Sequence, residues 1–436
     1  MASSSLDLIA ALQRVKQATA SINNSAIDNF ELAGVNPSLK HGSAALSDAT
    51  VLRARALTAM GETLARHQDD ILEANTLDLE ISRDMAVPEL VVDWLKLTPE
   101  RLQKVVSIFQ KLAVSGVGCV GGGPSAHISA QYRICPVGTV GFIYEAFPDL
   151  GAIAAALCIC TGNALVLKGG SEASRTNQII ANLLRDTLED VGLSAELIFP
   201  IESTEVSRQD VSRCSDIDLI IAHGRPSLVD QVVKQASVPV IPSRMGNCYL
   251  YWSASGSLDR VYQIVLDSHG GEPDAVNRIE KVLIHESHSH HAVVRLWNRL
   301  QEGGFEVVAD KVLTALHNAS AAEESGAVSV QEWKHAYLKN KVALCQVSDI
   351  TAAIEWINTH SSGHADSIVT TDYTESQQFM HGCRSSAVYI NTSPKFVRNA
   401  SHADVIALGA SNYKGIAGGL IGIDAMQVRQ RIFHGS

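Results

Sequence analysis

The sequence predicts a two-domain α/β protein built on parallel sheets that are covered by helices. Three observations predict this fold. The chain has 436 residues, more than one compact core holds, which indicates two or three domains of about 150 residues each. From residue 134 onward, short apolar segments alternate with amphipathic helical segments. The apolar segments are continuous, as in strands that are buried on both faces of a parallel sheet.

The N-terminal part of the chain is predicted to be mainly helical. Ser5 can cap a first helix. A second helical pattern runs from Ala49 to about Ala74, and a third from Pro99 to Leu112. The apolar face of the second pattern is formed by Leu57, Met60, Leu64 and Ile71. Residues 21–47 have no clear period and are interpreted as a loop or a local insertion.

A first series of strands and helices follows. Its strands are predicted at Val137–Tyr144, Ala164–Leu167, Glu196–Ile201, Asp218–Ala222 and Val238–Ile241. Its helices are predicted at Leu150–Cys160, Glu172–Val191 and Ser227–Ala236. Right-handed crossovers between parallel strands then give a doubly wound, Rossmann-like domain.

A second α/β series begins after Ser257. Its strands are predicted near Val307 and at Val342–Val347, Ser367–Thr370 and Ala387–Asn391. Its helices are predicted at Leu258–Asp267, Ile350–Thr359 and Glu375–His381. Two such blocks in series suggest a cofactor domain and a catalytic domain with a cleft between them.

Composition excludes several classes of function. The net charge of −11 is opposite to that of a nucleic-acid-binding protein. The longest apolar stretch, Leu150–Cys160, is shorter than the ~20 residues that a bilayer requires. The N-terminus lacks a basic region followed by an apolar block, so no secretory signal is expected. We therefore expect a soluble cytoplasmic protein with no nucleic-acid or membrane partner.

The cysteines and histidines do not predict a metal centre. The eight cysteines form no CxxC pair and no zinc-type spacing with histidine, and scattered thiols of this kind fit a reducing cytoplasm. Four histidines cluster at His285, His288, His290 and His291. A metal site and the polar start of a helix are the two interpretations, and we favour the helix start because a zinc site needs converging ligands with ordered support.

Two strand-to-helix corners could bind phosphate. At the first, a strand ends in Lys168, Gly169 and Gly170, and a helix begins near Glu172. Glycines allow close approach of a ligand, and a helix N-terminus offers free N–H groups to an anion. The alternative is a tight corner whose glycines serve only the turn. The second corner contains Gly224 and Arg225, and there a phosphate contact and a solvated arginine are equally consistent with the spacing.

Ordered motifs along most of the chain resemble the γ-glutamyl phosphate reductases of the aldehyde dehydrogenase superfamily. The motifs are Cys135–Glu145, Lys168–Glu172, Asp218–Ala222, Asn277–Glu280, Gly363–Thr370 and Val388–Asn391. The resemblance implies an aldehyde dehydrogenase-like fold and NADP(H) as cofactor. It implies reduction of a γ-glutamyl acyl phosphate to the semialdehyde in proline biosynthesis, through attack by a cysteine thiolate. It also implies a small oligomerisation β-hairpin, and hence a homo-oligomer, with a dimer favoured.

The same resemblance places non-matching residues at the chemical positions. The family's nucleophilic cysteine corresponds to Val276, directly before the retained Asn277. Cys248 and Cys345 lie in segments that are predicted to be buried strands.

The asparagine that resembles the family's oxyanion donor corresponds to Asp149. An ionised aspartate accepts hydrogen bonds and would repel the developing negative charge. The family's glutamate near the nicotinamide ribose falls at about Ser411. The sequence therefore predicts no intact catalytic residue.

The predicted domain plan has three parts. Residues 1–124 and 146–254 form the cofactor domain, residues 255–400 the catalytic-type domain, and residues 125–145 with 401–436 the oligomerisation element and C-terminal return. Three functions fit this plan. The favoured one is a pseudoenzyme that binds a ligand or protein partner. The alternatives are an active NADP-dependent oxidoreductase with altered chemistry and an inactive subunit of a mixed oligomer.

Overall fold

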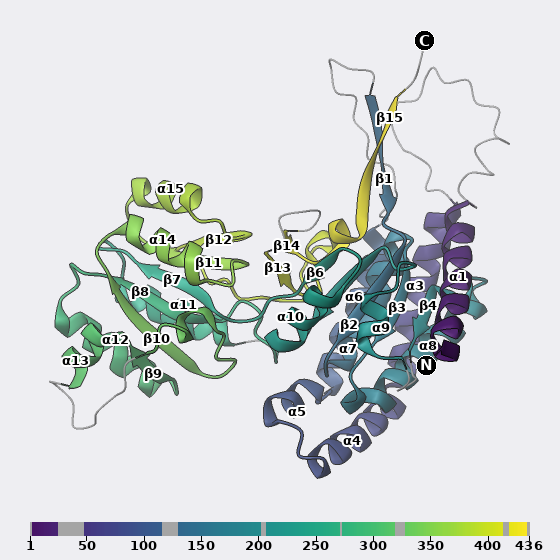
Figure 1. Ribbon diagram of the computed structural model, residues 1–436, viewed down its shortest axis with the longest axis horizontal. Helices are drawn as coiled ribbons and strands as arrows, with labels where there is room; N and C mark the ends of the chain where they lie inside the picture. The colour runs from purple at the N-terminus through teal and green to yellow at the C-terminus, as the bar shows by residue number, and fades with distance from the viewer. Residues whose placement is uncertain are drawn as a thin grey trace. The chain divides into compact units, whose positions relative to one another are not determined.

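The computed structural model describes residues 2–24, 48–115, 130–201, 206–270, 273–318, 328–412 and 418–433. The chain divides into two compact units, each with its own parallel sheet (Figure 1). The first unit comprises Met1–Pro242, Asn399–Leu408 and Gly422–Ser436, and the second comprises Ser243–Arg398 and Gly409–Ile421.

The sheet of the first unit has the strand order β4-β3-β2-β5-β6, and all its pairings are parallel. Its strands are β2 (Thr139–Tyr144), β3 (Ala164–Lys168), β4 (Ile198–Pro200), β5 (Leu219–His223) and β6 (Val240–Pro242). The chain runs outward from β2 to β4 and then returns to β5 on the other side of β2. This topology confirms the predicted doubly wound domain, and its switch point lies between β2 and β5.

Helices cover this sheet and extend beyond it. They are α1 (Ala2–Asn24), α3 (Asp48–Arg66), α4 (Gln68–Asp84), α5 (Glu89–Leu95), α6 (Pro99–Ser115), α7 (Pro148–Thr161), α8 (Ser174–Asp190), α9 (Arg208–Ser212) and α10 (Pro226–Gln235). Every residue of α7 is buried, because this helix packs against β2 and β3 and is covered by α3, α6 and α8. Short 3-10 turns occur at Ser171–Ala173, Ala195–Leu197, Ala403–Val405 and Ile423–Met426.

The predicted helix from Ala49 to Ala74 is two helices. The chain leaves helical geometry at His67, which has φ −101° and ψ 25°. The buried face of α4 is largely polar, since Asn75, Asp78 and Ser82 are buried there with Ile71. Asp78 accepts hydrogen bonds from the backbone N (2.8 Å) and the hydroxyl (2.7 Å) of Thr176, in the first turn of α8. Because polar residues form most of this buried face, the apolar periodicity of the sequence could not show where the first helix ends and the second begins.

A separate two-stranded antiparallel ribbon joins distant parts of the chain (Figure 1). It pairs β1 (Ala130–Pro136) with β15 (Gln427–Phe433). Both strands lie in the segments 125–145 and 401–436 that were predicted to form the oligomerisation element, and they form a ribbon of two strands that are far apart in sequence in place of a local hairpin. The predicted element 125–145 is divided as well, since β2 belongs to the main sheet while residues 125–129 lie outside the described residues.

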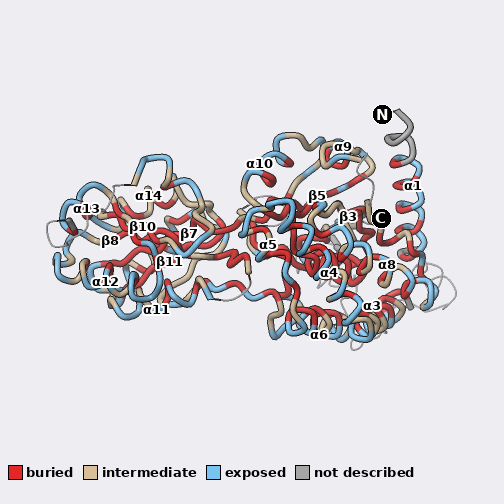
Figure 2. Tube along the Cα trace, turned by 90° about the horizontal axis from the view of Figure 1, so that it is seen from below, coloured by how far each residue is buried: buried red, intermediate tan, exposed pale blue. Residues whose placement is uncertain are grey.

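The sheet of the second unit has the order β12-β11-β7-β8-β10-β9, again with parallel pairings. Its strands are β7 (Cys248–Trp252), β8 (Ile279–His285), β9 (Glu306–Ala309), β10 (Lys341–Val347), β11 (Ala365–Val369) and β12 (Ala387–Ile390). Two apolar clusters, one containing Trp252, Trp297 and Leu344 and the other Tyr251, Leu283 and Phe379, form its core. In Figure 2 the tube is mostly red, and so buried, along β7, β8 and β10 as well as along β3 and β5 of the first unit.

The predicted boundary at residue 254 is too late. The division falls at Ser243, because β7 pairs with β8 and β11 in the second sheet. The other elements of this unit are α11 (Leu258–His269), α12 (His290–Glu302), α13 (Lys311–Asn318), a 3-10 turn (Glu332–Lys334), α14 (Ile350–His360), α15 (Tyr373–Gly382) and the short pair β13 (Ala410–Ser411) and β14 (Gly419–Leu420). No helix in the described part of the chain is long and apolar enough to cross a bilayer.

Candidate functional site

The loops that follow β2, β3 and β5 gather at the carboxyl edge of the first sheet. Ligands of open α/β sheets bind at this edge, at the topological switch point. The loop after β2 begins with Glu145, the loop after β3 contains Gly169 and Gly170, and the loop after β5 contains Gly224 and Arg225. The fold therefore brings the two predicted phosphate corners to one edge.

Arg225 is bound to Glu145 at the switch point. The Glu145 carboxylate accepts from Arg225 Nε at 2.9 Å, from Nη2 at 2.5 Å and from its backbone N at 3.2 Å. Burial alone would raise the pKa of Glu145, but the hydrogen bonds and charge of Arg225 outweigh it and hold that pKa below its usual value. Gly224 has φ +148°, and a side chain there would contact Glu145. Within the described residues, Arg225 thus donates its hydrogen bonds to the Glu145 carboxylate.

Contacts within the chain also explain why glycines occupy the first corner. A Cβ atom at Gly169 would overlap the Asn177 amide, and one at Gly170 would overlap the Glu172 carboxylate. Glu172 Oε1 accepts from the backbone N of Ala146 at 2.6 Å. Ala146 and Phe147 have φ values of 52° and 38°, so this bond supports a left-handed turn between β2 and α7.

Lys168, the last residue of β3, lies in an electrostatically perturbed position. Its pKa is lowered by burial and then by the nearby Arg208, while Asp210 acts in the opposite direction. Arg208 opens α9, whose first turn is fixed by Ser207 and Asp210 in a reciprocal capping box. Two cations and the Asp210 carboxylate thus lie near the end of β3. Sequence reasoning missed Arg208, because it lies in no strand-to-helix corner that carries glycines.

Asp149, in the first turn of α7, is bound by a buried arginine. Arg101 Nε and Nη2 donate to its two carboxylate oxygens at 3.0 and 2.5 Å. Arg101 Nη1 also donates to the carbonyls of Trp94 (3.1 Å) and Lys96 (2.6 Å). We expected Asp149 to repel the developing negative charge of an oxyanion. This expectation is corrected in one respect, because Arg101 balances the charge of Asp149. The signal was present in the sequence, since Arg101 shares the buried face of α6 with Val105 and Ile108.

In the second unit, Val276 lies fully buried in the loop before β8. Its carbonyl accepts from Gly246 N at 3.0 Å and lies 2.9 Å from His364 Nε2. Ala275, the preceding residue, has φ 37°. Asn277 donates through Nδ2 to the Pro394 carbonyl at 2.8 Å. The loop is therefore fixed by its backbone, and the side chain at 276 is aliphatic.

A thiol–imidazole contact lies beside the Val276 carbonyl. Cys248 Sγ is 3.3 Å from His364 Nε2, and His364 Nδ1 is 2.9 Å from Ser362 Oγ. Burial raises the pKa of Cys248 well above its usual value and lowers the pKa of His364 to about 4. Both groups are fully buried, so this pair is neutral and closed to solvent at neutral pH. Cys248 and Cys345 lie in buried strands, as predicted.

Ser411 is buried in β13 of the same unit and pairs with Gly419. The neighbouring Asn412 donates to the Ser362 carbonyl at 2.8 Å, which links this strand to the loop that carries His364. Val276 and Ser411 thus belong to one unit, while Asp149 belongs to the other.

The histidine cluster is the start of a helix, as favoured. Ser289 caps α12, and His290 and His291 are exposed in its first turn. His288 stacks on Trp252 at 4.0 Å and His285 contacts Ser287. Among the described residues, no group of three or more His, Cys, Asp or Glu side chains could hold a metal ion.

The fold is of the aldehyde dehydrogenase type. An acetylating aldehyde dehydrogenase from Geobacillus thermoglucosidasius aligns with a TM-score of 0.65 at 14% identity, over 98% of each chain. A γ-glutamyl phosphate reductase from Thermotoga maritima aligns with a TM-score of 0.82 at 23% identity, also over 98% of each chain.

Comparison of sequences narrows this class to one family. No family model matches this chain. Gamma-glutamyl phosphate reductase 2 of Synechocystis sp. is 43% identical over 391 residues, which cover 88% of this chain and 92% of the relative. The chain therefore belongs to the γ-glutamyl phosphate reductase family, as its motifs predicted.

Proposed function

We propose that this protein is a nucleotide-binding member of the γ-glutamyl phosphate reductase family that does not perform the thioester step. It retains the fold and a cationic strand end for NADP(H), and acts by binding a ligand or a protein partner. The observation that carries the proposal is Val276, an aliphatic, fully buried residue at the position that the family resemblance assigns to the nucleophile. Valine offers no electron pair for attack on an acyl carbon.

The surrounding residues support the same conclusion. The Cys248 thiol near Val276 is protonated and buried, and a thiol attacks acyl carbons as the thiolate. At the other degenerate position, both oxygens of Asp149 accept hydrogen bonds from Arg101, so neither is placed to donate to an oxyanion. Losing one oxyanion donor typically costs about 10²–10³ in rate.

The residues at the end of β3 fit NADP(H). Lys168 and Arg208 lie close enough for Arg208 to lower the pKa of Lys168. A phosphate monoester on the adenine ribose would add charge-assisted hydrogen bonds to these cations, which favours NADP(H) over NAD(H). Gly169, Gly170 and Glu172 shape the turn beside them, and Gly224 and Arg225 form the neighbouring corner. When bound, the nicotinamide ring would supply hydride for reduction.

Calorimetric titration with NADPH and NADH tests the cofactor assignment. We expect micromolar binding of NADPH, about −8 kcal/mol, and weaker binding of NADH. Arg208→Ala should weaken NADPH by about 10-fold or more, the loss of a hydrogen bond to a charged group, and leave NADH nearly unchanged. Arg213→Ala, at the C-cap of the same short helix, is the matched control. Equal affinity for both nucleotides would contradict the assignment of Arg208, and no binding at millimolar nucleotide would overturn the cofactor site.

Replacement at position 276 tests the loss of chemistry. The wild-type protein should show no NADP⁺-dependent oxidation of glutamate-5-semialdehyde in the presence of phosphate. Val276→Cys should form a covalent acyl adduct visible by mass spectrometry, whereas Val276→Ala should not. Turnover by pure wild-type protein would overturn the proposal and favour the alternative of an active oxidoreductase with altered chemistry.

The β1–β15 ribbon supports a homo-oligomer, with a dimer as the expected state. Within the described residues each strand of the ribbon pairs with the other alone, which leaves backbone groups along both outer edges for a second copy. Light scattering after size-exclusion chromatography tests this expectation, and a monomer at micromolar concentration would contradict it. Co-purification with a catalytically intact paralogue would instead favour an inactive subunit of a mixed oligomer.

A further inference from the structure

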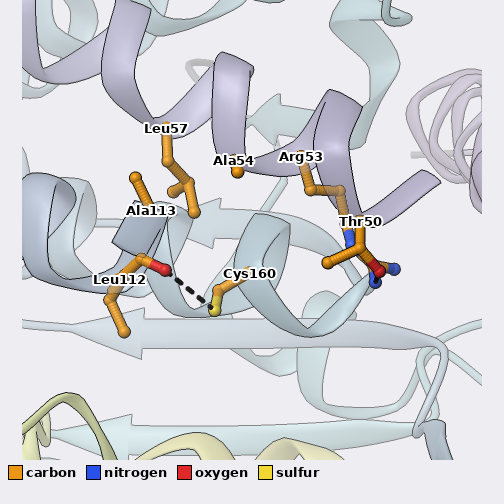
Figure 3. Close-up of a pocket in the computed structure, with 7 residues that line it drawn as sticks. All are labelled: Thr50, Arg53, Ala54, Leu57, Leu112, Ala113 and Cys160. Carbon is orange, nitrogen blue, oxygen red and sulfur yellow. Dashed lines mark hydrogen bonds between the residues drawn. The ribbon is translucent and has the colours of Figure 1, made fainter. Parts of the chain in front are cut away.

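A small cavity lies in the first unit between α3, α6 and α7 (Figure 3). Its volume is about 10 Å³, which leaves room for one small occupant. The described residues that line it are Thr50, Arg53, Ala54, Leu57, Leu112, Ala113 and Cys160. None of them belongs to the carboxyl edge of the sheet, so the cavity is distinct from the proposed nucleotide site.

Arg53 brings an unbalanced charge to this cavity. The residue is only 4% exposed, and its Nε is buried without a hydrogen bond. Its one hydrogen bond within the described residues is a long one, from Nη2 to Thr50 Oγ1 at 3.3 Å. A guanidinium keeps its proton even when it is buried. Burial of a charge without a counter-ion is costly, so an anion beside Arg53 would stabilise the folded protein.

The remaining wall provides donors and apolar contact but no negative charge. Among the described lining residues none is Asp or Glu, and no ion pair of Arg53 occurs in the described part of the chain. Figure 3 shows the Arg53 side chain beside Thr50, with Leu112 and Cys160 across the cavity. The Cys160 thiol lies 3.9 Å from the Leu112 carbonyl. A water molecule could accept from Nε but would leave the charge in place.

We propose that this cavity binds a single monatomic anion of the size of chloride, which neutralises Arg53. The small volume favours a monatomic ion over larger anions, and the cavity is too small for a nucleotide. Because the cavity joins α3, α6 and α7, the anion stabilises the helical layer that covers the first sheet.

Thermal unfolding of the full chain at constant ionic strength tests the proposal. Sodium chloride replaces sodium gluconate, whose anion is too large for the cavity. We expect the Tm to rise saturably, by about 2–4 °C when chloride reaches roughly ten times its Kd. In crystals soaked in sodium bromide, an anomalous peak should lie beside the Arg53 guanidinium.

Three variants distinguish this site from a general salt effect. Arg53→Met removes the charge and should abolish the chloride response, while Arg55→Met, on the exposed face of the same helix, should keep it. Ala113→Leu keeps Arg53 but fills the cavity, and it should also abolish the response. An equal rise in gluconate, or a chloride response that survives in Ala113→Leu, would overturn the proposal. So would a cavity without bromide, which would assign the space to water.

Discussion

Arg101 and Asp149 form a buried, bidentate ion pair that ties α6 to the first turn of α7. The pair places a carboxylate at the position where the family resemblance implies an uncharged donor. It also engages two further carbonyls, so Arg101 fixes the end of α5 as well. The carboxylate at position 149 thus has an ion-pair partner on another helix, and the pair cross-links α6 and α7.

Removal of one partner of this pair should be strongly destabilising. Asp149→Asn leaves the Arg101 charge buried without a counter-ion, and we expect a loss of about 3–5 kcal/mol in the free energy of unfolding. The measurement is urea denaturation followed by tryptophan fluorescence. Asp259→Asn breaks the more exposed pair with Arg299 and serves as the control, with an expected loss of about 0–1 kcal/mol. A loss below 1 kcal/mol for Asp149→Asn would show that the pair contributes little.

His364 should make the stability depend on pH. Burial lowers the pKa of His364 to about 4 from 6.5, so the unfolded chain binds this proton first as the pH falls. The stability that His364 contributes is therefore fully present above about pH 6.5 and is lost progressively as the pH falls toward 4. Denaturation of wild type and His364→Gln between pH 4 and 8 isolates this share, because the other titrating groups cancel in the difference. A difference that does not change with pH would contradict the prediction.

Native thiol reactivity should divide the cysteines by burial. Cys135 and Cys214 are partly exposed, whereas Cys248 is buried with a strongly raised pKa. We expect iodoacetamide to label Cys135 within minutes, Cys214 more slowly because burial raises its pKa, and Cys248 only after unfolding, as mapped by peptide mass spectrometry. Rapid labelling of Cys248 in the native protein would show that this thiol is accessible and would reopen it as a nucleophile.

Gly224 should tolerate substitution poorly because two effects act there together. It has φ +148°, and a Cβ atom would lie 3.0 Å from the Glu145 Cβ. Gly224→Ala should therefore cost about 1–3 kcal/mol of stability. Gly192→Ala is the matched control, since Gly192 has φ +85° with nothing within 4 Å, so only the backbone strain applies. Equal losses in the two variants would show that the contact with Glu145 has no weight.

The local sequence pattern predicted most of the strands and helices, but it predicted few of the ion pairs at the site. Continuous apolar runs identified β2, β3, β5 and β10, because a strand buried on both faces needs no partner information to be recognised. The assignment of β7 to a sheet failed for the same reason, since its residues are equally compatible with either core.

Ion pairs were missed because they join residues far apart in sequence. Arg225 was considered as a phosphate ligand, yet its carboxylate partner Glu145 lies 80 residues away. Arg101 and Asp149 are separated by 48 residues. Only the three-dimensional fold shows which opposite charges meet, so a lone arginine in a loop stays ambiguous in the sequence.

The β1–β15 ribbon has a consequence for the order of events during synthesis. β1 leaves the ribosome long before β15, because the strands of both sheets lie between them in the sequence. The nascent chain can complete the first sheet through β6 while β1 still lacks the strand that satisfies its backbone. Closure of the ribbon therefore waits until β15 has been made, and a transcript cut short before Gln427 yields a protein with an open strand edge.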